Sequence, residues 1–280
     1  MEFTKCQGAG NDFILIDNRD GKVQKKLQEL GIDLPTFVQK ICKFHTGVGA
    51  DGLILIEKPD NPQNDFKWQF FNADGSAAEM CGNGSRCAVR FVYEKGIVKK
   101  EHLKFETLAG VIEAWIKDKG RVVRVQLTKP FDLKLNFDIP LEGETLKGNF
   151  LNTGVPHVVV YTENLKDLNV KKYGSLIRYH KIFSPAGTNV NFIEPLSENE
   201  IAIRTYERGV EDETLACGTG STAAAIIAYL QGWIKQKPVK VHTKGGEVLI
   251  IDFDEKLEKV FLEGKVYKVF EGILSYEIFN

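Results

Sequence analysis

Two short segments of the chain share one pattern: a cysteine, then glycine, a polar residue, glycine and serine. They are Cys81-Gly82-Asn83-Gly84-Ser85 and Cys217-Gly218-Thr219-Gly220-Ser221. Each precedes an apolar run that a glycine ends, at Gly96 and at Gly232. Small polar residues suit the start of a helix, and glycine suits its end. We therefore expect a helix in each place, with the cysteine at its N-terminus.

A cysteine at the start of a helix is suited to acid–base chemistry. The unpaired backbone N–H groups and the helix dipole favour a thiolate there, and they also bind anions. Because the pattern occurs twice in 280 residues, we interpret the chain as two duplicated halves. One cysteine from each half is expected to face a shared cleft.

Such a pair of thiols can invert an amino-acid centre. A bound α-carboxylate would accept hydrogen bonds from the N–H groups around Gly82-Asn83 and Gly218-Thr219, where glycine leaves room for a ligand. The carboxylate becomes more electron-rich as the α-proton leaves, so these donors stabilise the transition state most. One cysteine, as thiolate, would remove the α-proton, and the other, as thiol, would protonate the opposite face. The pattern favours this reaction with no metal and no pyridoxal cofactor.

The two thiols need different protonation states in the resting enzyme, and nearby charges can supply that difference. His157 and Glu207 lie in glycine-rich turns of the second half, and both are candidates for this role. From spacing alone, a single histidine is more often a loop or core residue. That interpretation applies to the other histidines: His45, His102, His180 and His242.

Two other classes of function compete with this one. The two cysteines could close a disulfide and act as a redox sensor, but disulfide exchange needs no anion-binding helix ends. A non-catalytic protein could bind an amino acid and leave its α-proton in place. The remaining cysteines, Cys6, Cys42 and Cys87, are interpreted as small apolar core residues. No C-x-x-C or close Cys/His pair indicates zinc.

Composition limits the class of protein further. The chain is 43% hydrophobic and 27% charged, with a formal net charge of -1, as in ordinary globular proteins. The balanced charge argues against a general nucleic-acid or membrane-surface binder. No apolar run reaches the roughly 20 residues of a membrane span. The odd cysteine count of 5 without a secretion signal leads us to expect a cytoplasmic protein.

The order of expected elements predicts the fold class. Both halves run through a strand, a polar turn, the cysteine, a helix and more strands, without the strand–helix alternation of a doubly wound sheet. We expect an α+β fold of two pseudo-symmetric domains, each a mostly antiparallel sheet curled around a central helix. The N-terminal half is placed at residues 1–128, completed by a C-terminal strand at about 266–280. The C-terminal half is placed at residues 129–265.

Short polar and glycine-rich segments recur along the whole chain. They are Gly10-Asn11-Asp12-Phe13, Gly47-Val48-Gly49-Ala50-Asp51-Gly52, Phe71-Asn72-Ala73-Asp74-Gly75-Ser76, Met80-Cys81-Gly82-Asn83-Gly84-Ser85-Arg86-Cys87, Pro156-His157, Gly187-Thr188-Asn189-Val190, Tyr206-Glu207-Arg208-Gly209 and Ala216-Cys217-Gly218-Thr219-Gly220. Taken together and in this order, they resemble the diaminopimelate epimerases over nearly the whole chain. The resemblance implies a cofactor-independent isomerase that interconverts LL- and meso-2,6-diaminopimelate in bacterial lysine and peptidoglycan precursor synthesis.

The resemblance also implies roles for particular residues. Cys81 and Cys217 would be the acid–base pair, and His157 and Glu207 would adjust their protonation. Four residues would hold the reacting carboxylate: Gly82, Asn83, Gly218 and Thr219. The rest of the substrate would be held by Asn11, Asn72, Asn189, Glu207 and Arg208. A guanidinium such as that of Arg208 suits a bidentate carboxylate contact.

Two positions depart from the pattern of many members of this family. Gln commonly stands at the position of Gly52, and Asn at that of Val155, and both usually touch substrate. A different substrate within the superfamily is therefore an alternative, since the related proline racemases also use paired cysteines. The retained Asn72, Asn189 and Arg208 favour a substrate with a second amino-acid group. The resemblance also implies a homodimer, with Phe270 as the aromatic residue of its interface.

Overall fold

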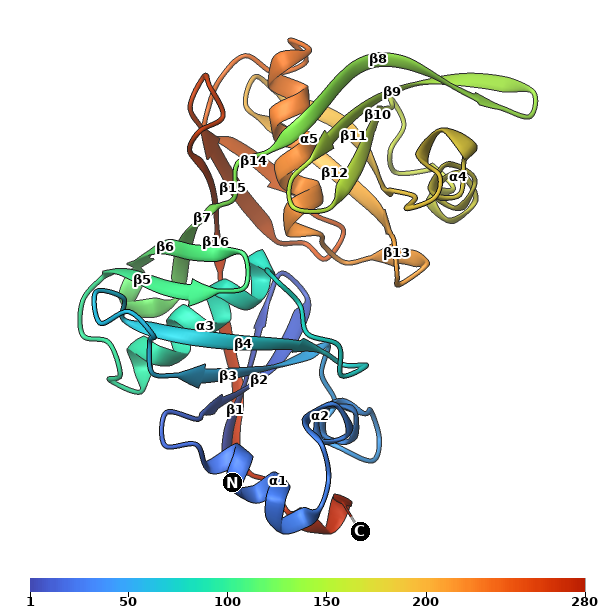
Figure 1. Cartoon of the computed structure of the whole chain (residues 1–280). Helices are drawn as coiled ribbons and strands as arrows, with labels where there is room; N and C mark the ends of the chain where they lie inside the picture. Colours follow the sequence, from blue (N-terminus) through green and yellow to red (C-terminus); the bar gives the residue numbers. More distant parts are fainter. Residues whose placement is uncertain (280) are drawn as a thin grey trace. The chain divides into compact units, whose positions relative to one another are not determined.

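A computed structural model describes residues Met1–Phe279, which form two compact units (Figure 1). The first unit contains Met1–Val125 and Gly264–Asn280, and the second contains Gln126–Glu263. The C-terminal strand returns to the first unit, where it pairs antiparallel with the N-terminal strand. The chain therefore enters the second unit and comes back once.

The first unit is built on a mixed sheet of eight strands in the order β17-β1-β2-β3-β4-β5-β6-β7. Five neighbouring pairs are antiparallel, and the pairs β2/β3 and β4/β5 are parallel. The strands are β1 Glu2–Gly8, β2 Asn11–Asp17, β3 Gly52–Glu57, β4 Phe66–Asn72, β5 His102–Thr107, β6 Gly110–Lys117, β7 Val122–Leu127 and β17 Tyr267–Ile273.

The central helix of this unit is α3, Gly82–Glu94, which packs on β1, β2 and β3 (Figure 1). Smaller helices lie at its periphery: α1 Lys22–Leu30, α2 Leu34–Cys42, η1 Asp118–Gly120 and η3 Tyr276–Phe279. The start of α2 has a local cause, because the Asp33 carboxylate accepts a hydrogen bond from the Thr36 N–H and Pro35 occupies the first turn. Its buried face, which includes Phe37, joins an apolar core with β2 and β3.

The second unit repeats this plan. Its main strands run in the order β8-β9-β10-β11-β12-β14-β15-β16, with parallel pairs at β10/β11 and β12/β14 and antiparallel pairs elsewhere. The short strand β13 pairs with β12. The strands are β8 Phe131–Leu141, β9 Glu144–Asn152, β10 Pro156–Tyr161, β11 Asn189–Ser197, β12 Glu200–Glu207, β13 Asp212–Thr214, β14 Val239–His242, β15 Val248–Phe253 and β16 Val260–Lys265.

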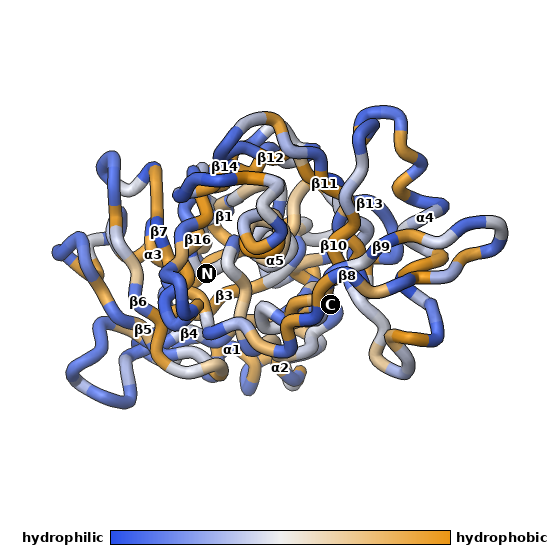
Figure 2. The backbone as a smooth tube through the Cα atoms, turned by 90° about the horizontal axis from the view of Figure 1, so that it is seen from above, coloured by the Kyte–Doolittle hydropathy of each residue, from blue (hydrophilic) through white to orange (hydrophobic). Residues whose placement is uncertain are grey.

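The central helix of the second unit is α5, Gly218–Leu230, which packs on β9, β10, β11 and β15. Most of its residues are buried, including the run Ala223-Ala224-Ala225, because small side chains let the surrounding strands come close. The helix α4, Val170–Arg178, packs on β11 and β12, and η2 spans Lys181–Phe183. Along many strands the backbone alternates between hydrophobic and hydrophilic residues (Figure 2), as expected when one face of a sheet covers a core.

The two units therefore have the same strand order, the same pattern of parallel and antiparallel pairs, and one central helix each. Each central helix begins directly after one of the two cysteines, at Cys81 and at Cys217. The expected α+β fold with two pseudo-symmetric halves and mostly antiparallel sheets is confirmed. The helices α1 and α4 were not among the expected elements.

The packing of α4 gives a stability prediction. A Cβ atom added at Gly174 would lie 2.4 Å from Cβ of Tyr206 on β12, so Gly174→Ala forces the helix away from the sheet. We expect the free energy of unfolding to fall by about 1–3 kcal/mol, the usual cost of overpacking. Urea unfolding followed by circular dichroism measures this. The matched control is Ser175→Ala, which should stay within about 0.5 kcal/mol; equal stability of both variants would contradict the close packing.

Candidate active site

In the first unit, the candidate site is the N-terminus of α3. Cys81 is the capping residue, with extended backbone angles of φ -148° and ψ 116°, and its Sγ accepts a hydrogen bond from the Gly84 N–H at 3.3 Å. The side chain of Cys81 is partly exposed, whereas Gly82 and Asn83 in the first helical turn are buried. The thiol thus lies where a helix stabilises negative charge and remains open to a small molecule.

A polar network ties this helix start to the loops around it. The Asn83 Nδ2 donates to Asn11 Oδ1 at 2.7 Å, and the Asn11 Nδ2 donates to Asp51 Oδ2 at 3.1 Å. Burial raises the pKa of the Asp51 carboxyl, although the hydrogen bond from Asn11 opposes this shift. Lys5 forms an ion pair with Asp12 beside the network at 2.8 Å. Asn11 and Asn83 are therefore brought together as two of the expected substrate contacts.

Asn72 and Gly52 face each other at the ends of β4 and β3. Asn72 is exposed, and its Nδ2 donates to Ser76 Oγ at 3.0 Å. A Cβ atom at Gly52 would lie 2.5 Å from the Phe71 carbonyl oxygen. No side chain fits at position 52 unless the backbone moves, which gives a physical reason for the glycine that departs from the family pattern.

In the second unit, the N-terminus of α5 has the same construction. Cys217 caps the helix in an extended conformation, and its Sγ accepts a hydrogen bond from the Gly220 N–H at 3.4 Å. Gly218 is buried and Thr219 is partly exposed. The prediction that each cysteine stands at the start of a helix is confirmed. Unlike Cys81, Cys217 is buried, with 8% of its surface exposed.

A chain of side chains leads from the core of this unit to the Cys217 sulfur. The His157 Nε2 lies 2.9 Å from Thr219 Oγ1, and Thr219 Oγ1 lies 3.5 Å from Cys217 Sγ. His157 is fully buried, and burial, aided by the charge of Arg208, lowers its pKa to about 3. The imidazole is therefore neutral at pH 7 and contacts the cysteine through a hydroxyl group.

The other expected contacts of the second unit gather at the ends of β11 and β12. The Asn189 Nδ2 donates to the Pro156 carbonyl at 2.9 Å, and its Oδ1 accepts from the Arg208 N–H at 2.9 Å. The Arg208 Nη1 donates to the Ala186 carbonyl at 3.2 Å. Glu207, the last residue of β12, is partly buried. Asn189 therefore fixes the backbone that carries Arg208.

Two buried polar residues near His157 were not predicted from the sequence: Asn191, which contacts the imidazole, and Thr205, which contacts Asn191. The Asn191 Nδ2 lies 3.2 Å from His157 Nδ1, and the Asn191 Oδ1 accepts from Thr205 Oγ1 at 2.9 Å. Both residues are buried. The available signal was the segment Asn189-Val190-Asn191-Phe192, where a second asparagine interrupts a strand that is otherwise apolar.

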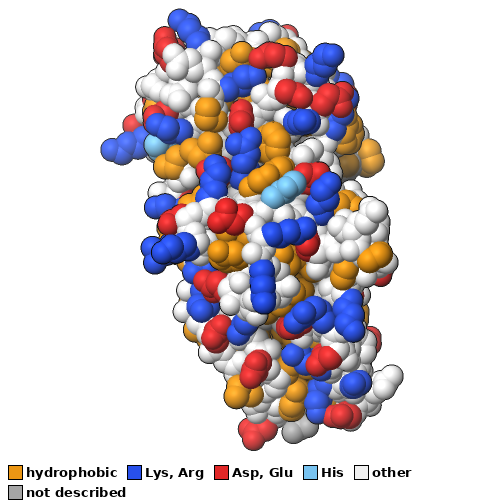
Figure 3. Space-filling model, turned by 90° about the vertical axis from the view of Figure 1, so that its left-hand side faces the viewer, with side chains coloured by type: hydrophobic (Ala, Val, Ile, Leu, Met, Phe, Trp, Pro, Cys, Tyr) orange, Lys and Arg blue, Asp and Glu red, His pale blue; other side chains and the backbone are white. Residues whose placement is uncertain are grey.

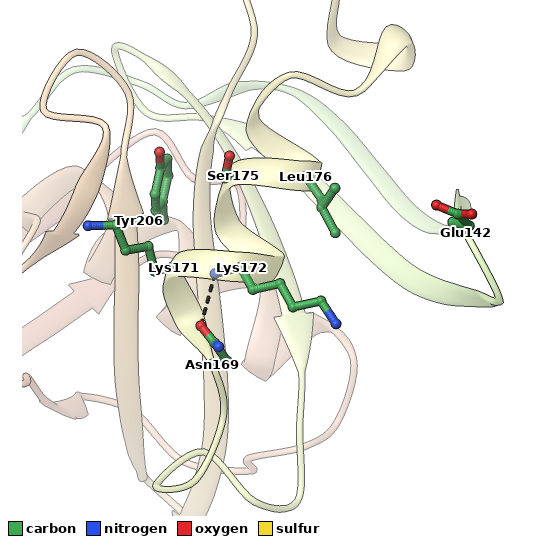
Figure 4. Close-up of a pocket in the computed structure, with 7 residues that line it drawn as sticks. All are labelled: Glu142, Asn169, Lys171, Lys172, Ser175, Leu176 and Tyr206. Carbon is green, nitrogen blue, oxygen red and sulfur yellow. Dashed lines mark hydrogen bonds between the residues drawn. The ribbon is translucent and has the colours of Figure 1, made fainter.

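A surface hollow of about 680 Å³ lies elsewhere in the second unit, against α4 (Figure 4). The Asn169 Oδ1 accepts a hydrogen bond from the Lys172 N–H at 3.0 Å beneath it. None of its lining residues was expected to act on substrate: Glu142, Asn169, Lys171, Lys172, Ser175, Leu176 and Tyr206. Within Met1–Phe279, no group of three acidic, cysteine or histidine residues is arranged to hold a metal ion.

Comparison with known proteins identifies the family of the chain. The family model described as diaminopimelate epimerase matches residues 3–131 and 149–269. A diaminopimelate epimerase of Aquifex aeolicus is 61% identical over 99% of both chains, and one of Hydrogenobaculum sp. is 57% identical over 100% of both.

Solved structures share the fold at low sequence identity. A PhzF-family phenazine biosynthesis protein of Bacillus anthracis superposes with a TM-score of 0.72 at 14% identity, covering 98% of this chain and 99% of its own. A hydroxyproline epimerase of Agrobacterium vitis gives a TM-score of 0.71 at 16% identity, covering 99% and 92%.

The family match makes the protein an isomerase, and its fold is shared with a solved epimerase structure. More particularly, the chain belongs to the diaminopimelate epimerase family. The expected family and enzyme class are confirmed by the match over nearly the whole chain.

The buried, neutral His157 predicts a pH dependence of stability. Its pKa is about 3 in the folded protein and about 6.5 in an unfolded chain. Between these values only the unfolded state binds the proton, so the free energy of unfolding falls as pH drops through this window, by up to ~1.4 kcal/mol per unit. Below about pH 3 the loss is complete. The free energy of unfolding, measured with urea from pH 7 to pH 4, should depend less steeply on pH in His157→Gln. The exposed His45→Asn control should keep the pH dependence of the unmodified protein, and an equal change in both variants would contradict the assignment to His157.

Proposed function

We propose that this chain interconverts LL- and meso-2,6-diaminopimelate and so serves bacterial lysine and peptidoglycan precursor synthesis. The observation that carries the proposal is the pair of equivalent cysteines, Cys81 and Cys217, each capping the central helix of its unit. Membership of the diaminopimelate epimerase family supports the choice of substrate. The two units would be the two domains expected from the sequence.

In the proposed reaction both sulfurs act on one carbon. One thiolate takes the α-proton, and the electron pair of the broken C–H bond is delocalised into the carboxylate. The other thiol gives its proton to the opposite face of the carbon, so the centre inverts and the two cysteines exchange protonation states. The carboxylate would be held by N–H groups of Gly82, Asn83, Gly218 and Thr219, whose hydrogen bonds strengthen as negative charge builds up.

The remaining roles follow the charges and positions of the side chains. His157 and Glu207 would adjust the protonation of the thiols. The distal amino-acid group of the substrate would be held by Asn11, Asn72, Asn189, Glu207 and Arg208. The guanidinium of Arg208 would pair with the distal carboxylate. No cofactor takes part in this scheme.

Charge and cysteine chemistry support proposals about location and partners. We infer a cytoplasmic enzyme from the odd count of 5 cysteines, which does not suit a full set of disulfide pairs. No helix among the described residues is both long and apolar enough to cross a membrane. On the face shown in Figure 3, basic and acidic side chains are interspersed, which does not favour a nucleic-acid partner.

We also infer a homodimer formed through β17. Several apolar side chains of this strand are exposed: Tyr267 41%, Val269 53%, Phe270 44% and Ile273 79%. The Phe270 ring is in edge-to-face contact with Phe3, with the ring centroids 5.7 Å apart, so it is held in place by the core of its own unit. Exposed apolar residues along one strand are a surface that a second copy can cover.

The two-base scheme predicts that Cys81→Ala and Cys217→Ala each lower the rate of epimerisation by at least ~10³-fold, because each removes a proton-transfer group. The assay follows conversion of LL- to meso-diaminopimelate in D2O, where inversion also introduces deuterium at the α-carbon. The control is Cys6→Ala, a buried thiol whose pKa burial raises to about 12, which should keep most of the activity. Substantial racemisation by either variant contradicts the scheme.

The same assay separates the competing functions. A redox sensor or an amino-acid-binding protein gives no deuterium incorporation even in the unmodified protein. An enzyme for another substrate of the superfamily incorporates deuterium into proline rather than into LL- or meso-diaminopimelate.

The dimer proposal predicts that Val269→Lys separates the two copies, because two buried ammonium groups would lie at the interface without partners. Sedimentation velocity at about 10 μM should show a dimer for the unmodified protein and a monomer for the variant. Val111→Lys, which changes an equally exposed valine on β6, should remain dimeric. An unmodified protein that sediments as a monomer refutes the proposal.

A further inference from the structure

The two units differ chemically at equivalent positions beneath their helix starts. In the second unit, Asn191 on β11 pairs with Thr205 on β12; in the first, Ile54 on β3 pairs with Phe70 on β4. The helix confirms the equivalence. A Cβ atom at Gly220 would meet Asn191 Oδ1 at 2.4 Å, and one at Gly84 would meet Ile54 Cδ1 at 3.3 Å.

By the same comparison, Phe13 of the first unit is the counterpart of His157 in the second unit. His157 pairs with Asn189 across β10 and β11, and Phe13 pairs with Gly52 across β2 and β3. The Phe13 and Phe70 rings are in edge-to-face contact at 5.8 Å. A polar column of Thr205, Asn191 and His157 in one unit thus replaces an apolar column of Phe70, Ile54 and Phe13 in the other.

The orientation of the Asn191 amide is determined by its neighbours. Its Nδ2 donates to the Val158 carbonyl at 3.0 Å, and its Oδ1 accepts from the Thr205 hydroxyl at 2.9 Å. Turning the amide over would set its oxygen against the Val158 carbonyl, two acceptors with no proton between them. The second Nδ2 hydrogen therefore points at His157 Nδ1, 3.2 Å away.

This orientation determines the tautomer of His157. A neutral imidazole has one N–H and one lone pair, so an Nδ1 that accepts from Asn191 leaves the proton on Nε2. The Nε2–H then donates to Thr219 Oγ1 at 2.9 Å. With its lone pair engaged, the Thr219 hydroxyl directs its own proton to Cys217 Sγ at 3.5 Å. In the opposite tautomer, Nε2 would accept the Thr219 hydroxyl proton, and a lone pair of the Thr219 oxygen would face the Cys217 sulfur.

We propose that Asn191, held by Thr205, is a positioning residue that fixes the tautomer of His157, so that a directed chain of donors ends on Cys217 and stabilises its thiolate. The inference rests on the proposed function, because it explains how two thiols in equivalent places can have different protonation states. In the first unit the residue equivalent to Thr219 is Asn83, whose amide donates to Asn11. The asymmetry lies in the columns beneath the helices, whereas the helix caps themselves are alike.

The tautomer is tested directly by NMR of the full chain labelled with ¹⁵N-histidine, in which His157→Gln assigns one of the 5 histidines. We expect the unmodified protein to show a pyrrole-like Nε2 and a pyridine-like Nδ1 for His157. In Asn191→Leu, which introduces an aliphatic side chain like that of Ile54, both tautomers should appear. A protonated Nδ1 in the unmodified protein overturns the proposal.

The consequence for the sulfur is tested by alkylation with iodoacetamide at pH 7, read out peptide by peptide by mass spectrometry. We expect the rate at Cys217 to fall about fivefold or more in Asn191→Leu, while the rate at Cys81 changes less than about twofold. The matched control is Asn149→Leu, another buried asparagine of the second unit, which should leave the rate at Cys217 unchanged.

Thr205→Val keeps the shape of residue 205 and removes only the hydroxyl that orients Asn191, so it covers the case in which Asn191→Leu does not fold. It should lower the Cys217 rate about twofold and broaden the His157 signals. An unchanged Cys217 rate in a folded Thr205→Val or Asn191→Leu variant refutes the proposal. Neither readout needs epimerase activity, so a failure here is distinct from a failure of the proposed function.

Discussion

The structure depends on one local interaction that occurs twice: a cysteine sulfur that accepts a backbone N–H at the start of a buried helix. At Cys81 the donor is Gly84, at 3.3 Å, and at Cys217 it is Gly220, at 3.4 Å. A side chain at either glycine would press on the strand behind it, at Ile54 or at Asn191. The need for a small residue in the first turn therefore links the chemistry of the sulfur to the packing of the sheet.

Each sheet packs around its helix, so that most residues of α3 and of α5 are buried. With α3 and α5 enclosed, the first turns of both helices are held firmly, and polar groups near them must be satisfied by the protein itself. Asn11 and Asp51 do this in the first unit, and His157 and Asn191 do it in the second. Duplication thus supplies two equivalent helix ends, and the residues beneath them make the ends chemically different.

The sequence alone was sufficient for several features because they depend on local patterns. The two cysteine motifs predicted both helix starts, and the repeated order of expected elements predicted an α+β fold of two pseudo-symmetric halves. The helices α1 and α4, of 9 residues each, were not predicted. In the fold, α1 packs against α2, and α4 packs against β11 and β12. The family was evident from motifs spread along the chain, since their order leaves few alternatives.

What the tertiary structure decided concerns residues that are distant in sequence. Nothing in the segment around His157 indicates that Asn191 contacts its ring or that Thr205 in turn contacts Asn191. Strand pairing and register bring these residues together. The glycine at position 52 likewise looks like a departure from a pattern until the nearby Phe71 carbonyl explains it. The chain by itself determined which residues can do chemistry and where the helices begin. The fold decided the surroundings of each group, because burial and hydrogen-bond partners come from strands far apart in the chain.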